Sequence, residues 1–242
     1  MFFSFLLHFR DYFVVYLEIP LKKGEMKMKI GLIAANGRAG SHILREARMR
    51  EHDVTAIVIN KANLRMRNVK TLEKDLFHLT KEDIEPFDVL INAFAPSTGE
   101  AYLHVKAGKH LISLLEGTNK KLFVVGSSGC LYVDKNHSIR LMEHKDYPEH
   151  LRESAKYQLQ NLHDLKNSSI QWTFLSPSAM FDSEGPRTGH YIIGSQRLVV
   201  NSQFNSYTSY ADFAVAVIDE LEISNHINRL FTIASENVTS AS

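Results

Sequence analysis

Cysteine is nearly absent from this sequence, and its scarcity excludes two kinds of protein. The single Cys130 cannot form a disulfide within the chain, nor can it supply a cysteine-rich metal site. The twelve histidines also show no spacing typical of metal ligands, so we predict no metal site. A reduced, cytoplasmic setting fits this cysteine usage best.

An excess of either charge is missing as well. The formal net charge is +1 with neutral histidines, and no long run of like charges marks a tail. A nucleic-acid partner is therefore not expected. Internal repeats and low-complexity segments are also absent.

The sequence also lacks a hydrophobic run long enough to cross a membrane. Arg10 and Asp11 divide the apolar N-terminal segment into runs well below the ~20 apolar residues that a spanning helix needs. The segment also lacks the basic start and small-residue cleavage site of a secretory signal. We therefore expect no membrane association.

The origin of residues 1–27 has two explanations. Residues 22–25 can be encoded by a purine-rich run that resembles a bacterial ribosome-binding site, just ahead of Met26 and Met28. In the first explanation translation starts at Met28, and residues 1–27 are an over-extended reading frame. In the second they are a genuine extension that packs on the domain or on a partner.

Apolar runs alternate with helical patterns over most of the remaining chain. Nearly continuous apolar strands are typical of a parallel sheet covered on both faces, and right-handed crossovers then give a doubly wound α/β arrangement. We predict strands at 29–35, 53–59, 69–77, 87–95, 121–128 and 170–178, and helices at 38–52, 99–117 and 148–166.

The last third has loop, short-strand and helix signals in turn, with a final strand at 229–235. Ser209 and Asp212 have the spacing of a helix capping box with Asp in place of Glu. No Pro/Gly/Ser-rich linker precedes this part, so we interpret it as a small C-terminal lobe built onto the sheet. Residues 28–242 are then one domain.

The stretch "AANGRAG" carries the main functional signal. Gly37 and Gly40 occupy the second and third positions of a dinucleotide-binding G-x-x-G-x-x-G turn, and Ala34 replaces the first. A predicted strand precedes the turn, and a helix whose N-terminus can hold an anion follows it. Arg38 adds positive charge there. The alternative is an ordinary strand–turn–helix connection in which Asn36 and Gly37 serve only the turn.

The end of the second predicted strand bears on cofactor choice. An NAD site usually has Asp or Glu here to bind the ribose, but the residues are Asn60 and Lys61, and Asp53 comes too early. These residues can accommodate a 2′-phosphate, so NADP(H) is favoured over NAD(H). Lys61 is equally compatible with a plain solvated lysine.

Five segments together resemble the NADH-flavin reductase group of the atypical short-chain dehydrogenase/reductases, in order and over residues 28–235. They are "KIGLIAANGRAGSHILREA", "FDVLINAFAPSTGEAYLHV", "LFVVGSSGCLYVD", "WTFLSPSAMFDSEGPRTGHY" and "TSYADFAVAVIDELE". The resemblance implies a Rossmann-type domain, an NAD(P)H cofactor and oxidoreductase chemistry. The wider family includes flavin and biliverdin reductases and NmrA-like regulators that bind the cofactor without turnover.

The resemblance also implies a cofactor site at the carboxyl ends of the strands. In chain order, its parts serve the pyrophosphate, the adenosine ribose, the adenine, the ribose linkage and, in the last two, the nicotinamide. The residues are Asn36, Gly37, Arg38, Ala39 and Gly40; Asn60 and Lys61; Asp75 and Leu76; Asn92, Ala93 and Phe94; Ser127 and Ser128; and Ser176, Pro177 and Ser178. Two departures from the family are Ala34 and the segment 127–130, which replaces a more glycine-rich stretch.

A tyrosine–lysine pair for carbonyl reduction is missing. Tyr102 and Lys106 have the Tyr-x-x-x-Lys spacing but precede Ser128, and Tyr147 has Leu151 four residues on. Hydride transfer to a flavin needs no such pair, because stacked rings and positioning suffice. Ser128 is the candidate catalytic residue, as a hydrogen-bond donor to acceptor or cofactor. It is equally compatible with a serine that satisfies backbone groups at a strand end.

Two further sets of residues have open roles. Arg187, His190 and Tyr191 lie in a loop that would cover the pocket, where they either touch an acceptor or are plain surface residues. We favour the second interpretation. The remaining set is expected to be solvated or at helix boundaries, and comprises His104, His110 and His163.

These observations predict an NAD(P)H-dependent oxidoreductase that reduces a small planar acceptor such as FMN, FAD or a quinone. The alternative is a non-catalytic NADP(H)-sensing regulatory protein. A third possibility, a degenerate fold acting as a structural partner, holds only if Ala34 abolishes nucleotide binding. The protein is expected to be a monomer or a homodimer.

Overall fold

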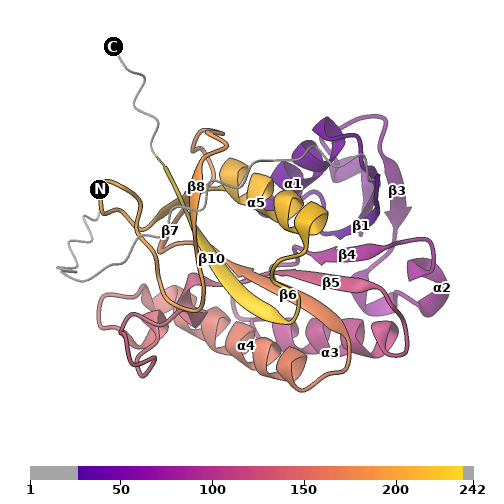
Figure 1. Ribbon diagram of the computed structural model, residues 1–242. Coiled ribbons are helices and arrows are strands. Elements are labelled where there is room, and N and C mark those ends of the chain that lie inside the picture. The colour runs from indigo at the N-terminus through magenta and orange to yellow at the C-terminus, as the bar shows by residue number, and fades with distance from the viewer. Residues whose placement is uncertain (1–26, 237–242) are drawn as a thin grey trace, which may run out of the picture.

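A central sheet of eight strands separates two layers of helices in the computed structural model, which describes residues 27–236 (Figure 1). The strand order is β3-β2-β1-β4-β5-β6-β10-β8, and all neighbours are parallel except the last pair. The strands are β1 Lys29–Ile33, β2 Asp53–Val58, β3 Lys70–Glu73, β4 Val89–Asn92, β5 Lys121–Val125, β6 Gln171–Ser176, β8 Tyr191–Gly194 and β10 Arg229–Ser235.

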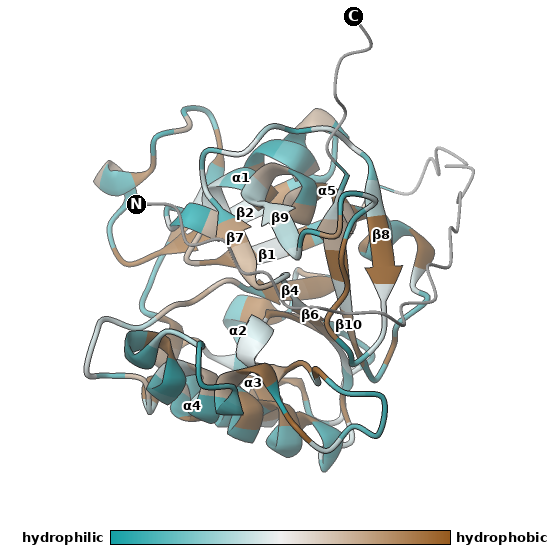
Figure 2. Cartoon of the chain, turned by 90° about the vertical axis from the view of Figure 1, so that its left-hand side faces the viewer, coloured by the Kyte–Doolittle hydropathy of each residue, from teal (hydrophilic) through white to brown (hydrophobic). Residues whose placement is uncertain are grey.

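The helices divide between the two faces of the sheet (Figure 2). One face carries α1 and α5, and the other carries α2, α3 and α4. The helices are α1 Arg38–Met49, α2 Lys81–Ile84, α3 Leu103–Leu115, α4 Glu149–Lys166 and α5 Tyr210–Ile223. This is the doubly wound arrangement predicted from the sequence.

Alternation along the strands distributes apolar side chains to two cores. In β1, Ile30 and Leu32 pack in the cluster that includes Phe213 of α5, whereas Ile33 packs in the cluster that includes Leu111 of α3. Successive side chains of a strand point to opposite faces of the sheet, so a strand covered on both faces needs apolar residues throughout. This requirement explains why the strands read as continuous apolar runs.

The last third of the chain completes the sheet and adds a small second one. Strand β8 pairs antiparallel with β10, while β7 (Met180–Asp182) and β9 (Tyr207–Ser209) form a separate parallel pair. The final strand at 229–235 is confirmed. Helix α2 and strands β7 to β9 were not predicted as separate elements, because segments this short show no clear hydrophobic period.

The capping box predicted at α5 is only half formed. The Ser209 hydroxyl accepts a hydrogen bond from the Asp212 N–H at 2.9 Å. The Asp212 carboxylate does not return to the Ser209 N–H, which instead donates to the Ser235 hydroxyl at 3.1 Å. The carboxylate accepts hydrogen bonds from Thr188 and Gly189, so the reciprocal half of the prediction is wrong. The Asp212 side chain therefore bonds a loop that is distant in sequence and not its own helix N-terminus.

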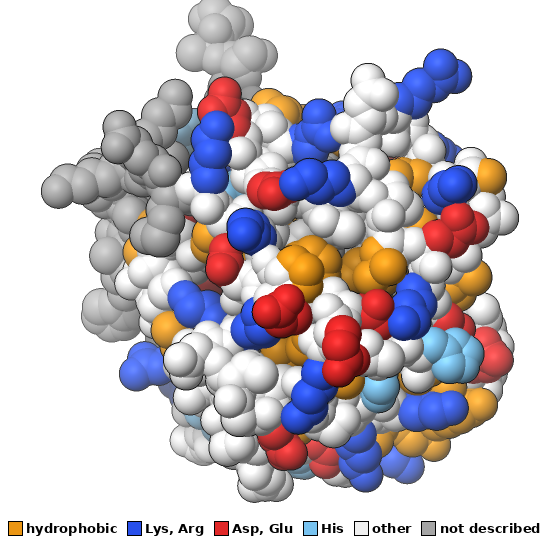
Figure 3. All heavy atoms as spheres, turned by 90° about the vertical axis from the view of Figure 1, so that its right-hand side faces the viewer, with side chains coloured by type: hydrophobic (Ala, Val, Ile, Leu, Met, Phe, Trp, Pro, Cys, Tyr) orange, Lys and Arg blue, Asp and Glu red, His pale blue; other side chains and the backbone are white. Residues whose placement is uncertain are grey.

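The surface at the β3 edge mixes both signs of charge (Figure 3). Lys70 pairs with Asp53 at 2.7 Å, and Lys74 pairs with Asp83 at 2.5 Å. Charged side chains on an edge strand discourage pairing with another chain. Between residues 27 and 236, none of the helices combines the length and apolar character needed to cross a bilayer. The two explanations for the N-terminal segment concern residues 1–27, of which residues 1–26 lie outside the described residues.

The histidines behave differently from one another. His163 is exposed, as predicted, and the ring of His110 lies 3.1 Å from the carbonyl oxygen of Leu79. The prediction for His104 is wrong, because this side chain is only 5% exposed. It lies between α3 and α4, with Nε2 3.1 Å from the Ser154 hydroxyl. The packing of the two helices, which the sequence alone does not show, buries it.

Burial lowers the pKa of His104 from 6.5 to about 4, so this residue makes stability depend on pH. The unfolded chain binds the proton at higher pH than the folded protein, so the contribution is complete above pH 6.5 and declines toward pH 4. The loss is on the order of 3 kcal/mol once the pH falls below both pKa values. We expect His104→Gln to flatten this part of the profile in urea unfolding.

His163→Gln is the matched control, because its exposed ring should leave the profile unchanged. Parallel profiles for the wild type and His104→Gln would contradict the assignment.

Candidate functional site

The turn after β1 adopts the backbone shape that the glycine-rich motif requires. Ala34 has φ 57°, in the left-handed region that favours glycine. The N–H of Gly37 donates a hydrogen bond to the carbonyl oxygen of Ala34 at 2.9 Å and closes the turn. Alanine is therefore tolerated at the first glycine position, at the cost of backbone strain.

Gly40 is required for packing. A Cβ atom on Gly40 would lie 2.2 Å from the carbonyl oxygen of Ala34, whereas one on Gly37 would lie 3.1 Å from the same oxygen. Real atoms cannot approach as closely as the first distance. Helix α1 thus rests directly on the turn, and only glycine fits at position 40.

The N-terminus of α1 is open to an anion. Gly37 is the N-cap residue, no side chain caps the helix, and its first turn contains no acidic residue. The first N–H groups of a helix lack partners within it, and the helix dipole places partial positive charge there. The residues present thus fit a phosphate-bearing group.

A cleft of about 680 Å³ lies beside this helix end. Three exposed arginines line it, Arg38 and Arg45 from α1 and Arg65 from the segment after β2. Among the described residues, no carboxylate forms an ion pair with these three guanidinium groups, and Glu184 is the one acidic residue of the lining. The full lining is Ala35, Asn36, Gly37, Arg38, Ser41, His42, Leu44, Arg45, Leu64, Arg65, Met66, Ser183, Glu184 and Gly185.

The structure brings part of the predicted site to this cleft. Asn36, Gly37 and Arg38 line it, and Ala39 and Gly40 lie in the first turn of α1. The other predicted residues end or follow the neighbouring strands β2, β3, β4, β5 and β6. Because these strands are parallel neighbours of β1 or of one another, their carboxyl ends lie along one edge of the sheet. Ligands of open α/β sheets bind at that edge.

Polar side chains at four strand ends shape the local backbone. Asn60 accepts a hydrogen bond from the Ala62 N–H at 2.8 Å, and Asp75 accepts one from the Phe77 N–H at 2.9 Å. The acceptors after β4 and β5 behave alike, Asn92 toward the Phe94 N–H and Ser127 toward the Gly129 N–H. These side chains turn the chain at the edge of the sheet.

Lys61 and Leu76 have different surroundings. Lys61 is exposed, with its ammonium group 3.9 Å from the Glu73 carboxylate. Leu76 is 5% exposed and packs in the core on the α3 side. Lys61 is therefore available to a ligand, whereas the Leu76 side chain is committed to packing.

The structure places Tyr147 beside the candidate catalytic serine. Its hydroxyl lies near Ser127 and Ser128, whose side chains act to lower the pKa of the phenol, and Ser128 is 9% exposed. Burial raises the pKa of Tyr147 and outweighs the effect of the two serines, so the phenol is protonated at neutral pH. The Tyr-x-x-x-Lys rule excluded this tyrosine because Leu151 stands four residues on. In the structure the cation over its ring is Arg152, 5.9 Å from the centroid.

The serines at the end of β6 and just after it are fully buried. The Ser176 hydroxyl donates to the carbonyl oxygen of Ser127 at 2.9 Å, and the Ser178 hydroxyl donates to that of Ile233 at 2.6 Å. Both residues are 0% exposed. Their hydroxyls therefore join β6 to its neighbours.

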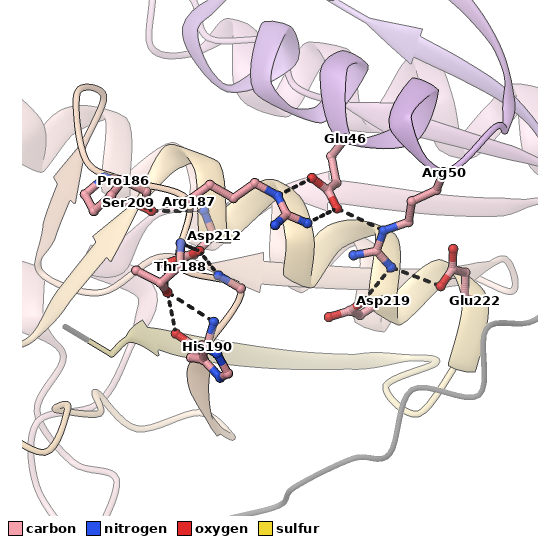
Figure 4. A network of polar contacts seen from close by, with 11 residues as sticks. Glu46, Arg50, Pro186, Arg187, Thr188, His190, Ser209, Asp212, Asp219 and Glu222 are labelled. Atoms are coloured by element: carbon pink, nitrogen blue, oxygen red, sulfur yellow. Dashed lines mark hydrogen bonds and ion pairs between the residues drawn. The ribbon is translucent and has the colours of Figure 1, made fainter. Parts of the chain in front are cut away.

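Arg187 belongs to a network of charged side chains between α1 and α5 (Figure 4). Tyr191 joins this network through Asp219. Arg187 donates from Nε and Nη2 to the two carboxylate oxygens of Glu46, at 2.8 and 2.9 Å. Tyr191 donates to Asp219. Arg187 and His190 are exposed, as predicted, although Arg187 is also paired with Glu46, whereas Tyr191 is only half-buried and bonds an α5 carboxylate.

Glu46 is the centre of this network. Burial opposes its ionisation, but hydrogen bonds from Arg187 and Arg50 outweigh burial and hold the pKa of the carboxyl below its ordinary value of 4.5. Arg50 also pairs with Asp219 at 2.6 Å and with Glu222 at 3.0 Å. The network thus joins α1, α5 and the loop that contains Arg187.

A doubly wound sheet with this turn and an uncapped helix N-terminus at its edge defines a Rossmann-type fold of the kind that binds nucleotides. Residues 34–221 match the NAD(P)H-binding family, and the chain belongs to that family.

Known relatives agree with this assignment. YwnB of Bacillus subtilis, an uncharacterized protein, is 49% identical over 211 residues, which are 86% of this chain and 99% of YwnB. The crystal structure of SP1627, a putative NADH-flavin reductase from Streptococcus pneumoniae, matches with a TM-score of 0.82 and 38% identity, covering 86% of this chain and 99% of that one. The anaerobilin reductase ChuY from Escherichia coli shares the fold, with a TM-score of 0.63 at 16% identity over 88% of this chain and 100% of ChuY.

The family match confirms two predictions from the sequence. The first is the likeness to the NADH-flavin reductase group, and the second is a nicotinamide nucleotide as cofactor. The predicted enzyme class, an oxidoreductase, is the class that these comparisons support. The preference for NADP(H), the acceptor and the individual site residues remain predictions.

Ala34→Gly tests the strained turn. Glycine adopts positive φ without strain, so we expect the free energy of unfolding to rise by about 1 kcal/mol. NADPH should bind equally well or more tightly. Urea unfolding and a fluorescence titration with NADPH measure the two effects.

The matched control is Glu51→Gly, at φ 63° just after α1 and outside the lining of the cleft. It should gain similar stability without any change in NADPH affinity. Weaker NADPH binding by Ala34→Gly would show that the turn has been misinterpreted.

Proposed function

We propose that this protein is an NAD(P)H-dependent oxidoreductase that prefers NADP(H) and reduces a flavin, a quinone or a similar planar acceptor. The observation that carries the proposal is the cleft beside the uncapped N-terminus of α1, with its three arginines. Two helix-end features, the open N–H groups and Gly40, suit the diphosphate. When bound, the nicotinamide supplies the hydride.

The arginines support the choice of NADP(H). Arg65 lies in the segment after β2, beyond the strand-end position where an NAD site has its acidic residue, and Arg45 faces the same cleft from α1. Guanidinium groups bind phosphate through paired N–H donors. We assign the 2′-phosphate to these two arginines, with Lys61 nearby in sequence as a further cation.

Arg65→Gln should raise the Kd for NADPH by about tenfold, the loss of one charge-assisted hydrogen bond. The Kd for NADH should change little, because NADH lacks the 2′-phosphate. Fluorescence titrations with both nucleotides measure the ratio. Arg67→Gln is the matched control, since Arg67 is exposed in the same segment but does not line the cleft. Equal losses for NADPH and NADH would contradict the assignment.

The hydroxyl groups at the end of β5 favour an acceptor that needs no strong base. Burial keeps the Tyr147 phenol protonated, so it is poorly suited to remove a proton. Ser128 and Tyr147 can still donate hydrogen bonds and orient an acceptor or the cofactor. Hydride transfer between two stacked ring systems requires position above all.

A non-catalytic NADP(H)-sensing role is the second candidate, and burial of the strand-end serines favours it. Ser176 and Ser178 are 0% exposed and Ser128 is 9% exposed. Tight packing at the predicted nicotinamide end leaves less room for an acceptor. Such a protein would bind NADPH without oxidising it.

The deciding experiment is a titration of the purified protein with NADPH and NADH, followed by FMN and then a quinone without oxygen. We expect NADPH to bind and to be oxidised when an acceptor is added. Ser128→Ala should lower kcat by roughly tenfold to a hundredfold and raise the Kd for NADPH by much less, because the phosphate contacts are kept. Loss of NADPH absorbance measures the rate.

Ser168→Ala is the control variant, because its hydroxyl bonds the Leu165 carbonyl at the far end of α4. Binding without oxidation of NADPH by any acceptor would favour the regulatory candidate. Absence of binding to both nucleotides would refute the proposed function.

A further inference from the structure

We propose that Arg187 and Glu46 are positioning residues that hold the two walls of the cofactor cleft at a fixed separation. The inference rests on the proposed function and adds a device that controls cofactor affinity. One wall is the N-terminal half of α1, and the other is the segment 183–185. Arg187 lies just after the second wall, and Glu46 lies on the helix that forms the first (Figure 4).

The loop that carries the second wall is anchored first to α5. The buried Asp212 carboxylate accepts hydrogen bonds from the Thr188 and Gly189 N–H groups, both at 2.8 Å, and from the Thr188 hydroxyl at 2.7 Å. The Ser209 hydroxyl donates to the carbonyl oxygen of Pro186 at 2.7 Å. These contacts hold the loop at the start of α5, but none of them reaches α1.

Close packing leaves the second wall little freedom toward β9. A Cβ atom on Gly185 would lie 2.2 Å from the Tyr207 hydroxyl oxygen and 2.7 Å from the Ser209 Cβ. The Tyr207 hydroxyl also bonds Asp182 at 3.0 Å. The wall therefore rests on β9 on one side and faces the cleft on the other.

The Arg187–Glu46 pair supplies the connection to α1. Its two parallel contacts, at 2.8 and 2.9 Å, fix the direction of the guanidinium plane as well as its distance. Glu46 is 3% exposed and cannot swing outward, because Arg50 holds the same carboxylate at 2.9 Å. Arg50 is in turn fixed by two carboxylates of α5. Arg187 thus joins the loop to a rigid point on α1.

If the second wall is already held in its binding position, less free energy is needed to order the cleft when the cofactor binds. If the loop were free to move away from α1, only the fraction of molecules with a closed cleft would bind the cofactor, and the apparent Kd would rise accordingly. The pair acts through the wall without touching the nucleotide.

Arg187 is suited to mutation because its removal does not leave the buried Glu46 carboxylate without an ion-pair partner. Its side chain is 45% exposed, and Glu46 keeps Arg50 as a partner. We expect Arg187→Gln to fold and to raise the Kd for NADPH by about tenfold. Arg187→Lys should recover part of the affinity for NADPH, since lysine keeps the charge but cannot make the bidentate contact with Glu46.

Glu46→Gln and the double variant test whether the two residues act together. If they do, the double variant should bind NADPH no more weakly than the worse single variant. Lys120→Gln is the control. Lys120 donates to the Glu85 and Phe87 carbonyl oxygens at 2.6 and 2.7 Å, at the amino end of β4 and so away from the carboxyl ends of the strands where the cleft lies. This variant should lower the thermal midpoint without changing the Kd.

The outcomes separate this inference from the proposed function. If the wild type binds neither NADPH nor NADH, the proposed function fails and the inference fails with it. If the wild type binds NADPH and Arg187→Gln binds equally tightly, only the inference is overturned. It is also overturned if Arg187→Gln and Lys120→Gln lose affinity in proportion to their thermal midpoints, since that result indicates general destabilisation.

Discussion

The close approach of Gly40 to the carbonyl oxygen of Ala34 is the constraint on which the site depends. It seats α1 on the end of β1, so that the open N–H groups of the helix face the carboxyl edge of the sheet. The left-handed backbone of Ala34 is the cost of that placement. A single methyl group at position 40 would displace the helix, and with it the wall of the cleft.

The charged network around Glu46 fixes the position of α1 relative to α5, the other helix on the same face of the sheet. Buried carboxylates are costly unless they are paired and hydrogen-bonded, and Glu46 has both kinds of support from two arginines. The orientation of α1 relative to α5 and to the loop of Arg187 is thereby specified in a way that apolar packing alone does not provide. Apolar contacts between helices tolerate small shifts of one helix against the other, whereas a bidentate ion pair such as Arg187–Glu46 does not.

Much of the fold could be predicted because its signals are local. The apolar runs of β1, β2, β4, β5 and β6 reflect burial on both faces, and the glycines of the turn reflect a backbone shape and a close contact. The predictions failed where the environment of a residue comes from elsewhere in the chain. His104 is buried because α4 covers α3, and the Asp212 carboxylate bonds the loop that precedes β8 instead of its own helix end.

The sequence by itself determined the doubly wound sheet, the nucleotide-binding turn and the family, since each depends on residue types at short, regular spacing. Only the tertiary structure decided which distant side chains meet. It brought Arg65 to the cleft of Arg38 and Arg45, placed the Tyr147 hydroxyl beside Ser128, and joined Arg187 to Glu46 across 141 positions of the chain. Contacts of this kind leave no periodic trace in a sequence, because their geometry is set by how helices and loops pack around the sheet.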